Sequence, residues 1–141
     1  MVSGYSARFL DHYRRPRNLG DLDAPDGMGL LHDNTCGDLL RLVVRVEGHG
    51  PTDAAGDGTI LAARFKAYGC AATIAVGSIL TEMVTGMSLR AAAEISADDL
   101  AEALGGLPAG RLHAAVLGRA ALCVAIEQAT GRQQKTGATE R

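Results

Sequence analysis

A thiol, a glycine and a carboxylate stand together at Cys36-Gly37-Asp38. Gly37 lets the backbone turn, so that the side chains of Cys36 and Asp38 can converge on one point. A thiolate is a soft ligand and a carboxylate is a hard one, and zinc accepts both. We therefore interpret Cys36 and Asp38 as candidate metal ligands in a turn just before a strand. Taken alone, the tripeptide is more typical of a turn with an incidental cysteine.

A second thiol, Cys70, follows Gly69 where a predicted strand meets the start of a predicted helix. The amides and the dipole at a helix N-terminus favour an anion there, and a thiolate is the form of cysteine that binds a metal. Gly69 permits a tight turn and keeps the approach to the thiol open. The alternative is a structural cysteine buried at a helix start.

A histidine, His113, stands in the first turns of the last predicted helix. The neutral imidazole ring is a common metal ligand, although a single histidine at this place also fits a surface or capping role. Among the other histidines, His32 lies near Cys36 and could support a ligand, whereas His12 and His49 rank lower.

The four candidate ligands Cys36, Asp38, Cys70 and His113 all fall at boundaries of predicted elements. Loops gather at one end of a small sheet, so these boundaries can meet. Together they offer the ligands that zinc or a 2Fe-2S cluster takes. The remaining cysteine, Cys123, is interpreted as a small buried hydrophobe.

Periodicity and turn residues predict an α+β fold, in which a small antiparallel three-stranded sheet packs against several helices. Predicted strands cover residues 28–32, 40–46 and 60–68, and predicted helices cover residues 5–14, 71–84, 88–92, 97–104 and 110–129. In the last strand, alternation places Leu61, Ala63, Phe65 and Ala67 on one face. Residues 1–131 are expected to form one domain, and residues 132–141 a disordered tail.

Composition and charge exclude several classes of function. The net charge of −2 and the pI near 6.0 argue against a nucleic-acid partner. We expect no apolar run to approach the roughly 18–20 residues that span a bilayer. The start of the chain resembles neither a signal sequence nor a transit peptide, so we predict a cytoplasmic protein. The chain lacks the motifs of common hydrolases and nucleotide-binding enzymes, so we predict that it is not an enzyme.

Five segments in a fixed order resemble the IscU/NifU-type iron–sulfur scaffolds, over roughly Tyr5 to Ala129. These segments are Asp11–Gly20, Cys36–Asp38, Phe65–Cys70, Thr81–Gly86 and the pair Leu107-Pro108 with Leu112-His113. The resemblance implies a site for iron, a 2Fe-2S cluster or zinc, and by position Cys36, Asp38, Cys70 and His113 match the family's ligands. It also implies a cysteine desulfurase as sulfur donor, and carriers or apo-proteins as recipients of the cluster.

Two departures from the family pattern stand out. The family has a cysteine directly after the histidine, as a cluster ligand and sulfur acceptor, and here Ala114 stands in its place. Cys123 lies nine residues further on and faces roughly the opposite way, so it is a poor substitute. The segment Leu107-Pro108-Ala109-Gly110-Arg111 keeps only the Leu-Pro pair and a basic last residue of the motif that dedicated chaperones recognise. Chaperones therefore remain candidate partners only.

Zinc-dependent SufU-type relatives share the two cysteine groups, but they lack the histidine and carry a long insertion before their last ligand. Residues 86–112 leave little room for such an insertion, so the chain resembles IscU and NifU more closely. The sequence thus predicts a cluster scaffold or carrier. The alternatives are a zinc-binding sulfur-transfer partner, or a regulator of a cysteine desulfurase that assembles no cluster.

Overall fold

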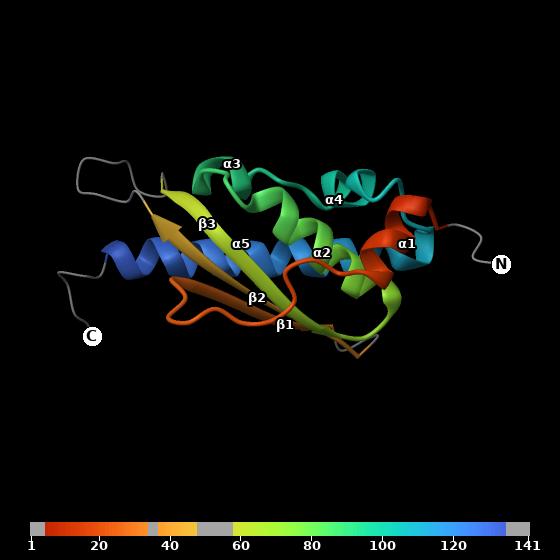
Figure 1. Cartoon of the computed structure of the whole chain (residues 1–141), viewed down its shortest axis with the longest axis horizontal. Helices are drawn as coiled ribbons and strands as arrows, with labels where there is room; N and C mark the ends of the chain where they lie inside the picture. Colours follow the sequence, from red (N-terminus) through yellow and green to blue (C-terminus); the bar gives the residue numbers. More distant parts are fainter. Residues whose placement is uncertain (1–4, 34–36, 48–57, 135–141) are drawn as a thin grey trace.

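The structure is a computed structural model, and it describes residues 5–33, 37–47 and 58–134. In chain order the elements are α1 (Ala7–Arg14), β1 (Gly27–Asp33), β2 (Asp38–Glu47), β3 (Thr59–Tyr68), α2 (Ala71–Val84), α3 (Leu89–Ala93), α4 (Ala97–Ala103), the 3₁₀ turn η1 (Ala109–Arg111) and α5 (Leu112–Gln134). The strands form one antiparallel sheet in the order β1-β2-β3. Figure 1 shows α2 and α5 side by side along this sheet. The predicted α+β fold is confirmed.

A β-bulge changes which residues of β3 face the core. The register between β2 and β3 shifts at Arg45/Val46, and Leu61 is the extra residue on β3. Leu61 is 47% exposed, whereas its neighbour Ile60 is fully buried on the side of Phe65. The expectation that Leu61 shares a face with Phe65 is therefore wrong, because an extra residue reverses the alternation of side chains beyond it.

Strand β1 lies unusually close to α5. A Cβ atom on Gly27 would lie 2.1 Å from the carbonyl oxygen of Ala125, and one on Gly29 would lie 2.1 Å from that of Ala121. Only glycine leaves room for this contact. Strand β1 begins at Gly27, one residue before the predicted start at residue 28. This packing holds α5 against the sheet and so fixes the position of its first turn.

Helix α2 is the central helix of the fold and is buried on most of its circumference. Its Gly77 packs against the ring of Phe65, since a Cβ there would lie 2.3 Å from that ring. The largest fully buried side chains include Phe9, Phe65, Leu40, Leu42 and Leu80. With 4% aromatic residues in the chain, aliphatic side chains and alanines fill most of the remaining core.

The helix starts follow the serines that the sequence offers. Ser6, Ser88 and Ser96 each accept a hydrogen bond from an amide of the first turn, and Ser96 forms a capping box with Asp99. Helix α2 differs, because its N-cap residue is Cys70 and this side chain makes no capping hydrogen bond. The thiol is thus free for another role.

Helix α5 is longer than its sequence pattern predicts. It ends at Gln134, so residues 132–134, expected to belong to the tail, are helical, and residues 135–141 lie outside the described part. Residues Leu112–Gly131 are long and apolar enough to cross a membrane, with a mean hydropathy of 1.2, by length and composition alone. The expectation that no apolar stretch reaches this length is therefore wrong.

The fold gives this apolar helix another explanation. In the most apolar 18 residues of this stretch, 50% of the residues are buried inside the structure. Figure 1 shows α5 running along the sheet, and its Ala121, Ala125 and Ala129 lie against Gly27 and Gly29 of β1. A core helix thus accounts for the composition. The cytoplasmic location stays a prediction.

Candidate metal centre

Three of the four predicted ligands converge at one end of the sheet. Asp38 begins β2, Cys70 is the N-cap of α2, and His113 is the second residue of α5. One donor atom from each of these side chains lies within 4.8 Å of the others. The fourth predicted ligand, Cys36, lies outside the described residues. The chain thus brings together a carboxylate, a thiol and an imidazole from three separate elements.

The carboxylate of Asp38 is the centre of this group and is only 2% exposed. Its Oδ1 accepts a hydrogen bond of 3.2 Å from the backbone amide of Cys70. Its Oδ2 accepts one of 2.9 Å from the hydroxyl of Thr73, and the Cys70 Sγ lies 3.7 Å from the same oxygen. Donors on both oxygens therefore fix the plane of the carboxylate.

The imidazole of His113 faces the same oxygen. Its Nε2 lies 3.0 Å from the Asp38 Oδ2, and its side chain is 23% exposed. A carboxylate can only accept here, so Nε2 carries the proton and donates it. Loss of that proton would turn the same nitrogen into a metal ligand that already points at the other two donor atoms.

Hydrogen bonds keep Asp38 ionised in this buried place. Burial alone would raise the pKa of the Asp38 carboxyl, because it disfavours the charged form. The hydrogen bonds from Thr73, the Cys70 amide and His113 act the other way, and the net result is a lowered pKa. The carboxylate is therefore in the form that binds a cation.

Two glycines make room for the site. Gly69 has a φ of +144°, and a Cβ there would lie 2.1 Å from the Asp38 Oδ1. Gly37 has a φ of +76°, a left-handed conformation that side chains rarely adopt. Gly37 therefore has the backbone conformation of a turn just before Asp38, and Gly69 leaves the space that the carboxylate fills, which was not foreseen from the sequence.

The donor set fits a metal ion. Zinc bonds of about 2.0–2.3 Å place tetrahedral ligand atoms about 3.3–3.8 Å apart. The Asp38 Oδ2 lies 3.7 Å from the Cys70 Sγ and 3.0 Å from the His113 Nε2. Small side-chain movements would therefore accommodate an ion. Soft sulfur with nitrogen and oxygen suits zinc or iron better than calcium or magnesium.

Sequence reasoning missed Thr73, and it proposed His32 as a supporting residue. Thr73 is fully buried and contacts two of the three ligands, yet a lone threonine carries no metal-site pattern. The available signal was its place three residues after Cys70, in the first helical turn. His32 is exposed on β1, opposite Leu39, and is not one of the three converging residues. Cys36, the ligand near which His32 was predicted to act, lies outside the described residues, so this supporting role stays a prediction.

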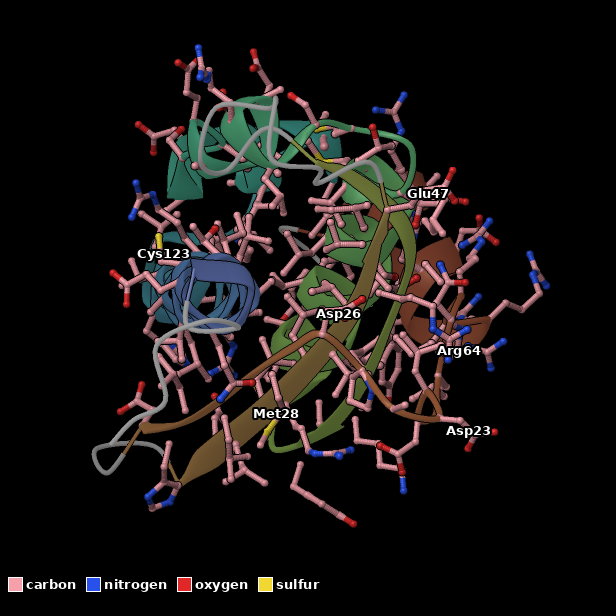
Figure 2. All side chains as sticks on the ribbon, turned by 90° about the vertical axis from the view of Figure 1, so that its left-hand side faces the viewer. Asp23, Asp26, Met28, Glu47, Arg64 and Cys123 are labelled. Atoms are coloured by element: carbon pink, nitrogen blue, oxygen red, sulfur yellow. The ribbon has the colours of Figure 1, made fainter. Side chains whose placement is uncertain are left out.

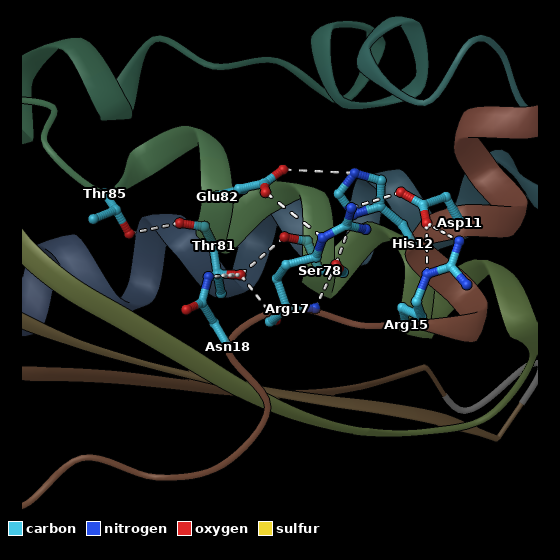
Figure 3. Close-up of polar contacts among 9 residues, drawn as sticks. All are labelled: Asp11, His12, Arg15, Arg17, Asn18, Ser78, Thr81, Glu82 and Thr85. Atoms are coloured by element: carbon cyan, nitrogen blue, oxygen red, sulfur yellow. Dashed lines mark hydrogen bonds and ion pairs between the residues drawn. The ribbon is translucent and has the colours of Figure 1, made fainter.

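The other histidine of a described helix, His12, belongs to a separate polar cluster between α1 and α2 (Figure 3). Its Nδ1 lies 2.7 Å from the Ser78 hydroxyl, and its Nε2 lies 3.6 Å from Glu82. Arg17 joins this cluster through Asp11 and through the Ser78 hydroxyl. These contacts hold α1 and Arg17 against α2, and none of them involves a residue of the candidate metal centre.

Cys123 also lies away from the metal centre. Figure 2 shows it on the side of α5 that is turned away from the sheet. It is half-buried rather than buried as expected, and Arg119 Nη1 lies 3.2 Å from its sulfur. Ala114 is fully buried beside His113, so the position after the histidine carries no thiol.

The fold and these residues define a small α+β domain with mixed sulfur, nitrogen and oxygen donors. Residues 4–136 match the NifU-like N-terminal domain family. The chain is 39% identical over 125 residues to the iron–sulfur cluster assembly scaffold protein IscU of Escherichia coli K12, covering 86% of this chain and 91% of that one. The chain therefore belongs to the NifU-like N-terminal domain family, as its sequence segments predicted.

Two further comparisons agree. The chain is 42% identical over 134 residues to the bifunctional protein NifU/MnmA of Rubrobacter xylanophilus, covering 94% of this chain and 26% of that one. It thus spans about a quarter of that longer relative. A crystal structure from Fervidobacterium islandicum, assigned as a SUF-system scaffold, matches with a TM-score of 0.68 at 19% identity, covering 86% of this chain and 96% of that one. This likeness concerns the fold.

Proposed function

We propose that this chain is an iron–sulfur cluster assembly scaffold. It would bind iron or a 2Fe-2S cluster, or zinc, on Cys36, Asp38, Cys70 and His113, and pass the cluster to apo-proteins or carriers. The observation that carries this proposal is the convergence of a thiol, a carboxylate and an imidazole within 4.8 Å. Relatives named as iron–sulfur cluster assembly scaffold proteins, at 37–39% identity, support the same class of function.

Each ligand has a distinct part in this proposal. Cys70 and Cys36 would supply thiolates, which are the usual ligands of iron–sulfur clusters. His113 would supply its Nε2 and Asp38 its Oδ2. Cys36 precedes Asp38 by two residues, and the left-handed Gly37 between them would let its thiol turn towards the same point. Two thiolates and two weaker donors suit a protein that must later release its cargo.

The proposed partners follow from the family. A cysteine desulfurase would donate the sulfur, and apo iron–sulfur proteins or carriers would accept the assembled cluster. In this role the chain holds and transfers its cargo, so we regard it as a scaffold rather than an enzyme. Whether chaperones bind the segment from Leu107 to Arg111 stays an open prediction of the sequence.

A second function is favoured by one observation. Ala114 leaves no thiol beside His113, although family members carry a sulfur-accepting cysteine there. The chain could therefore be a zinc-binding sulfur-transfer partner, or a regulator of a desulfurase that assembles no cluster. A carboxylate, an imidazole and two thiolates form a complete zinc site. Zinc retained under conditions that reconstitute clusters elsewhere would favour this alternative.

Metal analysis of protein purified without oxygen tests both functions. We expect one iron–sulfur cluster or one zinc per chain or per dimer, seen by absorption and by elemental analysis. Cys36→Ala or Cys70→Ala should abolish binding, and His113→Ala should weaken it. Cys123→Ala is the control and should bind as the unchanged chain does. Equal metal content after loss of both Cys36 and Cys70 would show that the assigned site is wrong.

A further inference from the structure

The hydroxyl of Thr73 makes an unusual contact for a threonine inside a helix. Such hydroxyls commonly bond back to a carbonyl one turn earlier on the same helix. Thr81 and Thr85 of the same segment do so, at 2.9 Å and 2.7 Å. The Thr73 hydroxyl instead donates across the structure to the Asp38 Oδ2, 35 residues earlier in the chain.

This contact touches two candidate ligands at once. The Thr73 Oγ1 lies 2.9 Å from the Asp38 Oδ2 and 3.5 Å from the Cys70 Sγ. Thr73 is fully buried and Asp38 is 2% exposed, so water has little access to replace the hydroxyl. A buried hydrogen bond to a charged oxygen is stronger than one in water.

The need for this hydroxyl increases when a metal binds. Without metal, both His113 Nε2 and Thr73 Oγ1 donate to the Asp38 Oδ2. As a ligand, His113 would point a lone pair at the metal and could no longer donate to Asp38. Among the described residues, Thr73 would then be the side chain left to donate to that oxygen, whose second lone pair would face the metal.

We propose that Thr73 is a positioning residue, which holds the Asp38 carboxylate in the orientation that binds the metal or cluster. The Cys70 amide fixes Oδ1 and the Thr73 hydroxyl fixes Oδ2, so the carboxylate cannot rotate away. This inference rests on the metal site proposed above. Residues that orient metal ligands in this way commonly change metal affinity by about 10–100-fold when they are replaced.

Cobalt binding to the whole chain tests this role without any assembly assay. Absorption from thiolate-to-cobalt charge transfer reports binding to the cysteines, and zinc competition gives affinity. Thr73→Val removes the hydroxyl while keeping the shape, and should weaken binding about 10–100-fold. Thr73→Ser keeps the hydroxyl and should bind within a few-fold of the unchanged chain. Thr81→Val is the matched control, since its buried hydroxyl contacts Ser78, Arg17 and Asn18 but none of the candidate ligands, and should leave affinity unchanged.

The second pair, Thr73→Ser and Thr73→Ala, differs only in the hydroxyl and keeps the test decisive if Thr73→Val does not fold. Serine should bind more tightly than alanine by the same factor. Two results would overturn the role of the hydroxyl and show that Thr73 only packs. One is equal affinity of the unchanged chain and Thr73→Val together with equal affinity of Thr73→Ser and Thr73→Ala. The other is a Thr73→Ser variant that binds as weakly as Thr73→Val. If the unchanged chain binds no cobalt, the proposed metal site itself fails, and the inference fails with it.

Discussion

The carboxylate of Asp38 occupies the space that a side chain on residue 69 would fill. A Cβ atom on Gly69 would lie 2.1 Å from the Asp38 Oδ1 and 2.7 Å from its carboxyl carbon. Asp38 begins β2, and Gly69 lies between the end of β3 and the start of α2. The missing side chain of Gly69 therefore leaves room for the carboxylate of Asp38 beside the start of α2. The geometry of the candidate metal centre thus depends on a residue that offers no ligand.

Gly69→Ala should therefore damage the metal centre more than the fold. The new methyl group would push the Asp38 carboxylate from its two donors, and the φ of +144° would be strained by about 1–3 kcal/mol. We expect cobalt affinity to fall about ten-fold or more. Cobalt titration gives the affinity, and denaturant unfolding gives the free energy of unfolding.

Gly86→Ala provides the matched control for this change. Gly86 also has a positive φ, +93°, but a Cβ there would meet no atom within 4 Å. Its replacement should reduce the free energy of unfolding by a similar amount and leave cobalt affinity unchanged. Equal loss of affinity in both variants would mean that backbone strain, and not the clash with Asp38, causes the effect.

Asp38 should be required for metal binding. Because Ala114 leaves no thiol beside His113, the charged carboxylate of Asp38 is needed as a ligand. Asp38→Ala should lose metal, and Asp38→Asn, which keeps the shape without the charge, should lose most of it. Elemental analysis and the lifetime of a reconstituted cluster measure this. A longer-lived cluster in the Asp38→Ala protein would contradict the prediction.

The sequence predicted those members of the candidate metal centre whose side chains are common metal ligands. Asp38, Cys70 and His113 were found because each is a metal-ligand type at the boundary of a predicted element, and boundaries meet at one end of a small sheet. Thr73 was not found, because a threonine in a helix has no such pattern. Only the three-dimensional structure shows that β2 brings Asp38 within reach of the Thr73 hydroxyl.

The fold was predictable where it depends on local patterns, and less so where it depends on packing. Alternation and helical spacing predicted the three strands and the five α-helices of the described residues, and the predicted ends differ from the observed ends by a few residues. The bulge at Leu61 has no local signal, so one residue was placed on the wrong face. Gly27 lies outside the predicted strand although it begins β1, because only the packing shows that α5 needs its bare backbone.

The buried His12 predicts a pH dependence of stability. Burial lowers the pKa of its ring, and Arg17 acts in the same direction, against Glu82 and Asp11. The unfolded chain, with an ordinary pKa of about 6.5, therefore binds the proton more readily than the folded chain. This contribution to stability is complete above about pH 6.5 and is lost as the pH falls through the folded pKa.

Denaturant unfolding between about pH 8 and pH 5 measures this dependence. His12→Gln removes the titrating ring and keeps a polar partner for Ser78, so the free energy of unfolding should vary less with pH over that range. His32→Gln is the control, because His32 is exposed on β1. A pH dependence that is unchanged in His12→Gln would assign the titration to other groups.

A thiol at position 114 should strengthen cluster binding. Ala114 directly follows His113 in the first turn of α5 and is fully buried. Ala114→Cys adds a third soft ligand beside the imidazole, and soft sulfur holds iron–sulfur clusters more tightly than carboxylate oxygen does. We expect faster cluster assembly with a cysteine desulfurase and a thiol reductant, and a longer lifetime on dilution. The larger side chain should reduce the free energy of unfolding by about 1–3 kcal/mol.

Ala115→Cys separates ligation from the mere presence of another buried thiol. Ala115 is equally buried, but it lies about 100° further round the helix, so its sulfur would point away from His113. This variant should cost similar stability and gain no cluster lifetime. If the unchanged chain already accepts sulfur as fast as Ala114→Cys, another cysteine is the acceptor, and Cys123 must be tested next. If neither chain accepts sulfur or binds a cluster, the result favours the alternative of a regulator that assembles no cluster.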